Sequence, residues 1–169
     1  MNIDFIILAA GKGTRMGGDS PKVLASLAGK PMIQHLIDTV DSFPSSKTSI
    51  VVGYKSNEVE SDLVSQKKLR FVKQKNQLGT AHAVKQALPY IRKNSIAVIL
   101  YGDVPLVKKN TLNKLIKSAS KGKLSLLTFM KEDPKGYGRI IRSSRKNVQK
   151  IIEHKDASSV EKEIREVNS

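Results

Sequence analysis

A loop rich in glycine and positive charge follows the first apolar run of the chain. Residues 4–8 are almost wholly apolar, and residues 9–21 then contain four glycines together with Lys12 and Arg15, directly before Lys22. Glycine lets backbone N–H groups approach phosphate oxygens that a Cβ atom would keep away. Because three cations exceed what one phosphate requires, the loop predicts a polyphosphate site rather than an ordinary surface loop.

The loop does not match the common phosphate-binding motifs. It lacks the Gly-Lys-Ser/Thr ending of a Walker loop, and Met16 stands where a dinucleotide fingerprint has its third glycine. The acidic residue expected on a ribose after the second strand is replaced by Gly53-Tyr54-Lys55. Hydride transfer is therefore disfavoured.

Asp103 is the second group that could do chemistry. It follows the apolar run of residues 96–100 after Tyr101 and Gly102, and a hard carboxylate at the end of a buried strand suits Mg²⁺. A turn residue in Gly-Asp-Val-Pro is an equally good interpretation of the residue taken alone. The three histidines, His35, His82 and His154, have no metal-ligand spacing and are interpreted as structural or surface residues.

The elements that must hold these residues follow an alternating pattern. Short apolar runs ending in small residues predict strands buried on both faces, and apolar positions three and four apart predict helices. The pattern predicts an α/β fold, a three-layer Rossmann-like sandwich with a mostly parallel central sheet and a later antiparallel pair. The loops after residues 8, 73, 100 and 129 should then meet at one cleft. Strands are expected at residues 4–8, 49–52, 69–73, 96–100, 124–129, 139–142 and 148–152, and helices at residues 32–40, 57–66, 80–91, 111–120 and within 156–166.

Length and composition set the class of protein. The 169 residues fit one domain, residues 1–169, and 39% hydrophobic and 27% charged residues are ordinary for a globular protein. No apolar run reaches the roughly 20 residues of a membrane span. Neither a leader peptide nor a membrane partner is expected, and the lack of cysteine fits the reducing cytoplasm.

The charge is strongly positive. Thirty Lys and Arg against 15 acidic residues give +15, yet only seven of the thirty are Arg, the residue that reads base edges. A lysine-rich excess spread along the chain is typical of a solvated surface, so no nucleic-acid partner is expected.

Five ordered motifs between residues 8 and 168 resemble one enzyme family. They are Leu-Ala-Ala-Gly-Lys-Gly-Thr-Arg-Met at 8–16 with Pro-Lys-Val-Leu at 21–24, Gln-Lys-Asn-Gln-Leu-Gly-Thr-Ala-His-Ala at 74–83, Leu-Tyr-Gly-Asp-Val-Pro-Leu at 100–106, Gly-Tyr-Gly-Arg-Ile at 136–140, and Ile-Glu-His-Lys-Asp-Ala at 152–157. The first is similar to the signature of the sugar-phosphate nucleotidyltransferases (MobA-like NTP transferases). Together they resemble the uridylyltransferase half of the bifunctional bacterial N-acetylglucosamine-1-phosphate uridyltransferase/glucosamine-1-phosphate acetyltransferases.

The resemblance implies a reaction and a set of roles. A sugar 1-phosphate would attack the α-phosphorus of UTP with Mg²⁺ as cofactor, giving UDP-N-acetylglucosamine for cell-envelope precursors. Asp103 would bind the metal and act in catalysis with Arg15 and Lys22. The implied nucleotide-binding residues are Leu8, Ala9, Ala10, Gly11, Lys22, Gln74, Gly79, Thr80, Tyr101, Gly102 and Asp103, and the implied sugar-binding residues are Gly138, Glu153 and Asn168.

Several of these residues also have plainer interpretations. Arg15 and Lys22 can be solvated surface charges, Thr80 can be a helix N-cap, Tyr101 can fill the core, and Glu153 can be a solvated strand end. In the family the polypeptide continues beyond the matched region, completes the metal site with an asparagine, and then forms a trimeric β-helix with the acetyltransferase. The fold is accordingly expected to be C-terminally incomplete, with no coenzyme A site, reduced or absent activity, and a monomer or dependence on a second chain. The alternatives are a related transferase with another nucleotide or acceptor, and a non-catalytic nucleotide- or polyanion-binding module.

Overall fold

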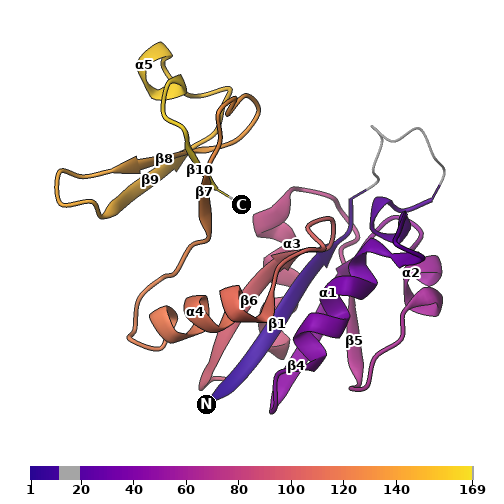
Figure 1. Cartoon of the computed structure of the whole chain (residues 1–169). Helices are drawn as coiled ribbons and strands as arrows, with labels where there is room; N and C mark the ends of the chain where they lie inside the picture. The colour runs from indigo at the N-terminus through magenta and orange to yellow at the C-terminus, as the bar shows by residue number, and fades with distance from the viewer. Residues whose placement is uncertain (12–19, 169) are drawn as a thin grey trace. The chain divides into compact units, whose positions relative to one another are not determined.

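The protein divides into two compact units. The computed structural model describes residues 1–11 and 20–168. The first unit is Met1–Ser120 and the second is Lys121–Ser169. Each unit has its own sheet (Figure 1).

A four-stranded parallel sheet forms the centre of the first unit. Its strands are β1 (Asn2–Ala9), β4 (Ser46–Val52), β5 (Leu69–Lys73) and β6 (Ser95–Tyr101), in the order β5-β4-β1-β6. β1 pairs with β4 and with β6 in parallel register. Its apolar run, residues 5–9, therefore occupies an inner position of the sheet, where both faces are covered.

Helices cover both faces of this sheet, as the sequence pattern predicts. Phe5 and Ile7 of β1 belong to the larger core cluster, with side chains of α1 (Met32–Asp41), α2 (Ser56–Asp62) and α4 (Lys109–Ala119). Ile6 points to the opposite face and packs with Ala83 and Ala87 of α3 (Thr80–Ala87). The α/β three-layer sandwich is confirmed.

Two helices end earlier than their sequence pattern predicts. α3 stops at Ala87 and continues as the 3₁₀ turn η3 (Leu88–Tyr90), because Pro89 has no N–H to extend an α-helix. α2 stops at Asp62, where Leu63 turns to an extended conformation, and the amide of Gln34 then bonds both the N–H and the C=O of Val64 at 3.0 and 2.7 Å. The remaining short elements of this unit are η2 (Lys22–Leu24), β2 (Ser26–Leu27) and β3 (Lys30–Pro31).

A buried carboxylate fastens the amino end of β1. Asp4 is 2% exposed and accepts hydrogen bonds from Arg92 N (2.8 Å), Arg92 Nε (2.8 Å) and Ser95 Oγ (2.6 Å). Burial alone raises the pKa of Asp4, but the bonds from Arg92 and Ser95 outweigh burial and lower it. The contact between Asp4 and Arg92 therefore joins β1 to the turn that precedes β6.

The second unit is an antiparallel sheet in the order β7-β10-β8-β9. Its elements are β7 (Thr128–Met130), β8 (Arg139–Arg142), β9 (Val148–Ile152), α5 (Ser159–Lys162) and β10 (Glu166–Asn168). The expected strand pair is confirmed, because β8 and β9 form an antiparallel ladder. The short helix begins with a capping box between Ser158 and Glu161.

The predicted fifth strand of the parallel sheet is wrong. The structure places a strand at Thr128–Met130 instead of residues 124–129, and that strand pairs antiparallel with β10. Leu124 is 98% exposed, so the apolar run predicted to begin at this residue is not buried at its start.

Among the described residues, no helix is both long and apolar enough to span a bilayer.

Two arginines hold the second unit together. Arg142 binds Glu166 through Nη2–Oε1 (2.5 Å) and Nε–Oε2 (2.7 Å), and Thr128 Oγ1 donates to the same carboxylate at 2.7 Å. The Arg142 bonds, opposed by partial burial and helped by Thr128, lower the pKa of Glu166 to about 2. Arg139 is 1% exposed and donates to the carbonyl oxygens of Tyr137 and Lys162.

Candidate nucleotide site

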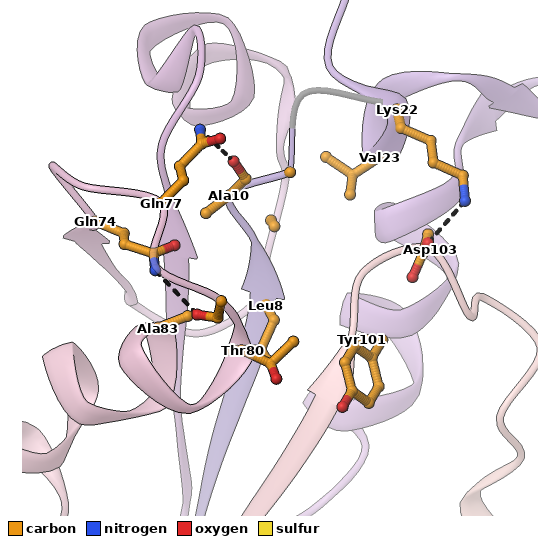
Figure 2. A pocket seen from close by; sticks show the side chains of 13 residues that line it. Leu8, Ala10, Lys22, Val23, Gln74, Gln77, Thr80, Ala83, Tyr101 and Asp103 are labelled. Atoms are coloured by element: carbon orange, nitrogen blue, oxygen red, sulfur yellow. Dashed lines mark hydrogen bonds and ion pairs between the residues drawn. The ribbon is translucent and has the colours of Figure 1, made fainter. Parts of the chain in front are cut away.

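A pocket of about 460 Å³ opens at the carboxyl ends of β1 and β6 and at the first turn of α3. This volume is within the range of small-molecule sites. Three of the four loops expected to converge contribute to it, those after residues 8, 73 and 100 (Figure 2). The loop after residue 129 belongs to the second unit. The lining residues are Leu8, Ala9, Ala10, Gly11, Lys22, Val23, Gln74, Gln77, Gly79, Thr80, Ala83, Tyr101 and Asp103.

Lys22 and Asp103 meet at one side of the pocket. Lys22 Nζ donates to Asp103 Oδ2 at 2.8 Å, although the two residues are 81 positions apart in the chain. Pro21 and η2 set the backbone of Lys22, and the turn after β6 sets that of Asp103. Both side chains are more than a third exposed. The pair is therefore open to solvent and weak, on the order of 1 kcal/mol or less.

Gln74 lies in the opposite wall and is almost fully buried. It is 4% exposed, and its backbone N–H donates to Val52 O at 2.8 Å. Its side-chain nitrogen donates to Gly79 O at 3.2 Å and contacts His82 Nδ1 at 2.9 Å. No described residue donates to Gln74 Oε1. The amide thus enters the pocket with its oxygen free to accept.

Sequence reasoning missed three lining residues, Val23, Gln77 and Ala83. Gln77 Nε2 donates to Ala10 O at 2.9 Å and so joins the Gln74–Thr80 segment to the start of the glycine-rich loop. A signal for Gln77 was present, because it is a second glutamine three residues after Gln74. Val23 and Ala83 carry no polar group, and only the fold shows that they face the pocket.

Gly102 supports the pocket from behind and is itself buried. Its N–H donates to Leu8 O at 2.9 Å. A Cβ at this position would lie 3.0 Å from both Leu8 O and Val23 Cγ1. Glycine fits here because β1 and η2 approach the turn so closely that a Cβ would force Leu8 O or Val23 Cγ1 to shift.

The structure places two of the remaining residues that the sequence predicts to bind nucleotide, Thr80 and Tyr101, in the pocket lining. Arg15 lies outside the described residues, with Lys12. Thr80 is the first residue of α3 rather than its N-cap, which is Gly79, and α3 has no side-chain cap. Tyr101 is 36% exposed in the pocket lining, so it does not fill the core.

The three sugar-binding candidates lie near one another in the second unit. Asn168 N donates to Gly138 O at 3.2 Å, and a Cβ on Gly138 would lie 2.7 Å from Asn168 Oδ1. Arg139 of β8 pairs with Ile152 of β9, so Gly138 and Glu153 are the next residues beyond that pair. Glu153 is exposed.

Asp103 is the residue whose chemistry fits a magnesium ion. Its carboxylate offers hard oxygen ligands, and Oδ1 accepts no bond from a described residue. Within residues 1–11 and 20–168, no group of three or more His, Cys, Asp or Glu side chains could hold a metal. One carboxylate suffices for Mg²⁺, which is usually bound by one or two carboxylates, waters and substrate phosphates.

Proteins of known sequence and structure resemble this chain in sequence and in fold. The bifunctional protein GlmU of Nitrosomonas eutropha is 49% identical over 170 residues, which are 100% of this chain and 37% of GlmU. HddC from Yersinia pseudotuberculosis is 26% identical with a TM-score of 0.70, covering 89% of this chain and 69% of HddC. UDP-glucose pyrophosphorylase in complex with UDP-glucose shares the fold at 17% identity, with a TM-score of 0.76 over 99% of this chain and 74% of that structure.

The chain thus spans just over a third of the length of curated relatives such as this GlmU protein. The model of the MobA-like NTP transferase domain matches residues 5–165, which is nearly the whole chain. The protein therefore belongs to the MobA-like NTP transferase family.

Proposed function

We propose that the protein transfers UMP from UTP to N-acetylglucosamine 1-phosphate, giving UDP-N-acetylglucosamine and pyrophosphate. The observation that carries this proposal is the pocket in which an amide, Gln74, faces a cation and a carboxylate, Lys22 and Asp103. A nucleobase and a metal-bound triphosphate require these groups at two separated positions. The 49% identity to a GlmU protein supports the uridine nucleotide and the amino sugar.

The reaction needs alignment and charge cancellation more than proton transfer. A phosphate oxygen of the sugar 1-phosphate attacks the α-phosphorus, forming a new P–O bond. The bond from that phosphorus to the bridging oxygen breaks, and pyrophosphate leaves with the electron pair. The nucleophile is already anionic at neutral pH, so the protein supplies no base, and its work is to position groups and stabilise charge.

Each proposed residue has one task. Lys22 places its ammonium against the phosphate oxygens, and Asp103 would hold Mg²⁺, which neutralises phosphate charge when bound. Arg15 is proposed as the second catalytic cation. Leu8, Ala9, Ala10 and Gly11 present backbone groups, and Gly79, Thr80 and Tyr101 border the nucleotide. Gly102 acts from behind the pocket by keeping the turn after β6 close to β1.

Gly138, Glu153 and Asn168 are proposed to bind the sugar. The Glu153 and Asn168 side chains and the Gly138 backbone can form hydrogen bonds with the hydroxyl and acetamido groups of the sugar. The support for this assignment is that the three residues lie near one another in the second unit. Synthesis of a cell-envelope precursor from UTP places the proposed activity in the cytoplasm, where nucleoside triphosphates are made.

A nucleotide panel tests the substrate. Pyrophosphate release from UTP, CTP, GTP and dTTP is measured with N-acetylglucosamine 1-phosphate and Mg²⁺. We expect UTP to be preferred, and EDTA to abolish release. GTP belongs in the panel because a solved structure of HddC from Yersinia pseudotuberculosis is complexed with GMP-PN. A preference for any other nucleotide would overturn the UTP assignment.

The metal assignment has its own test, the Asp103→Asn variant. The amide keeps the size of the side chain but loses the negative charge that attracts the metal. We expect kcat/KM to fall by about 10²-fold or more. Asp62→Asn, which removes an exposed carboxylate outside the pocket, is the matched control and should retain wild-type kinetics. Activity that survives Asp103→Asn with an unchanged Mg²⁺ requirement would show that Asp103 is not the ligand.

A further inference from the structure

We propose that His82 is a positioning residue for base selection: it fixes the amide of Gln74 so that the amide oxygen faces the nucleobase, and this favours uracil over cytosine. The inference rests on the proposed function, because it assigns the base to the Gln74 side of the pocket. His82 does not line the pocket and acts through Gln74. Figure 2 shows the Gln74 amide with its nitrogen on the bond to the start of α3 and its oxygen turned away from that bond.

The surroundings of Gln74 determine which end of its amide is the nitrogen. Gly79 O, a backbone carbonyl, can only accept, and the amide atom 3.2 Å from it must therefore be a donor. A 3.2 Å bond is long, and Gly79 O already accepts from Ala83 N at 3.1 Å. By itself this contact would hold the amide weakly.

His82 supplies the second and shorter contact. Its Nδ1 lies 2.9 Å from the same amide nitrogen. When Nδ1 accepts, both amide hydrogens of Gln74 have partners, and turning the amide over would set its oxygen against two acceptors. An unpaired polar atom in a site this buried is strongly unfavourable. The orientation with Oε1 toward the pocket is therefore the stable one.

The protonation of the ring follows from the difference in burial between two glutamines. Neutral imidazole has one N–H, so only one ring nitrogen can accept, yet Gln86 Nε2 also lies 3.2 Å from His82 Nε2. Gln86 Nε2 also donates to His82 O at 3.3 Å, so turning the Gln86 amide over would set two oxygens against each other. Gln86 is half-buried, however, and its amide can move to bond water, whereas Gln74 is 4% exposed. Nδ1 is therefore the accepting nitrogen, and the proton lies on Nε2.

A fixed acceptor distinguishes the two pyrimidines. Uracil presents an N3–H donor on its pairing edge, and cytosine presents an unprotonated N3 acceptor at the same position. Oε1 of Gln74 matches uracil and repels N3 of cytosine. Buried groups left unpaired by the wrong substrate are a strong source of rejection in binding sites. An amide free to turn over would instead offer either partner.

The test is the ratio of kcat/KM for UTP to that for CTP in His82 variants. His82→Leu removes the acceptor, and His82→Phe removes it while keeping a ring. We expect both to lower the ratio at least tenfold, chiefly through KM for UTP. His82→Asn places an oxygen near the former Nδ1 position and should keep the ratio within threefold of wild type. Lys85→Ala, on the exposed side of α3, is the control and should keep the wild-type ratio.

Affinities for UTP and CTP are measured by calorimetry on the same proteins, together with melting temperatures. An unchanged ratio in His82→Leu and His82→Phe overturns the inference. So does an equal loss for both nucleotides with a lowered melting temperature, since a purely structural residue would behave in that way. If the wild type releases no pyrophosphate but binds UTP better than CTP in a His82-dependent manner, the proposed function fails and the inference stands.

Discussion

Gly102, which lies behind the pocket, has little room for added atoms. A methyl group there would press on Leu8 O and Val23 Cγ1, both 3.0 Å away, and one of these is backbone. We predict that Gly102→Ala destabilises the protein by about 1–3 kcal/mol, because overpacking forces β1 or η2 to shift. At roughly 2–4 °C per kcal/mol for a chain of this size, calorimetry would detect the change.

A matched glycine serves as the control for Gly102→Ala. A Cβ at Gly11 would meet no described atom within 4 Å, so Gly11→Ala should leave the melting temperature nearly unchanged. Weaker UTP binding should accompany the loss of stability in Gly102→Ala, since Leu8 and Val23 both line the pocket. Equal melting temperatures for the two variants would contradict this account of Gly102.

At the scale of residues, the sequence predicts identities better than orientations. The type and place of Asp103 suggest a metal ligand, and the resemblance adds Lys22, but their 2.8 Å contact depends on how the turn after β6 meets η2. The direction of the Gln74 amide is not encoded in its own segment alone. It results from two acceptors, Gly79 O and His82 Nδ1, that become neighbours when α3 begins.

At the scale of elements, the apolar runs and the glycines and prolines that bound them predict most strands and helices of the first unit. The strand at residues 69–73 matches β5, and the run at 96–100 lies within β6. The errors arise where long-range contacts override local pattern. Val64 lies outside the helix and donates to Gln34, 30 residues away. The strand at Thr128–Met130 pairs antiparallel with β10 instead of joining the parallel sheet. Neither contact can be read from the residues of the affected segment.

The ion pair of Arg142 and Glu166 predicts a pH dependence for the second unit. The folded-state pKa of Glu166 is about 2, below the ordinary value of 4.5. Its contribution to stability is therefore fully present above pH 4.5 and is lost as the pH falls through about 2. Urea denaturation should find that Glu166→Gln is less stable than wild type at pH 7, and that the difference shrinks towards pH 2.

Glu132→Gln is the control for this pH effect. Glu132 is exposed and makes no ion pair with a described residue, so its loss should leave the pH profile unchanged. A difference between Glu166→Gln and wild type that grows as the solution becomes more acidic would mean that Glu166 does not have a depressed pKa.

At the scale of the whole molecule, the two units differ in the size of their cores. Both large clusters of buried apolar side chains belong to residues 1–120. In the second unit, the buried apolar residues among those described are Ile140, Ala157 and Val167. A small core leaves little free energy to resist local opening.

We predict that the second unit opens more readily than the first. Amide hydrogen exchange followed by mass spectrometry should show faster exchange in β7, β8, β9 and β10 than in β1 and β4. The peptides of α4, in the first unit, provide an internal control for helix exchange and should remain protected where Leu112 and Ile116 are buried. Equal protection of the two sheets would contradict this division of stability.

Along β1, the contact that stabilises the strand, the Asp4–Arg92 ion pair, is separated from the residues that line the pocket. Asp4 and Ala9 are five residues apart, which is about 16 Å in an extended strand. The ion pair with Arg92 lies towards one end and the pocket lining lies at the other. Protein engineers can therefore adjust heat tolerance at the Asp4 end by redesigning the ion pair, while the ligand-contacting end keeps its native residues.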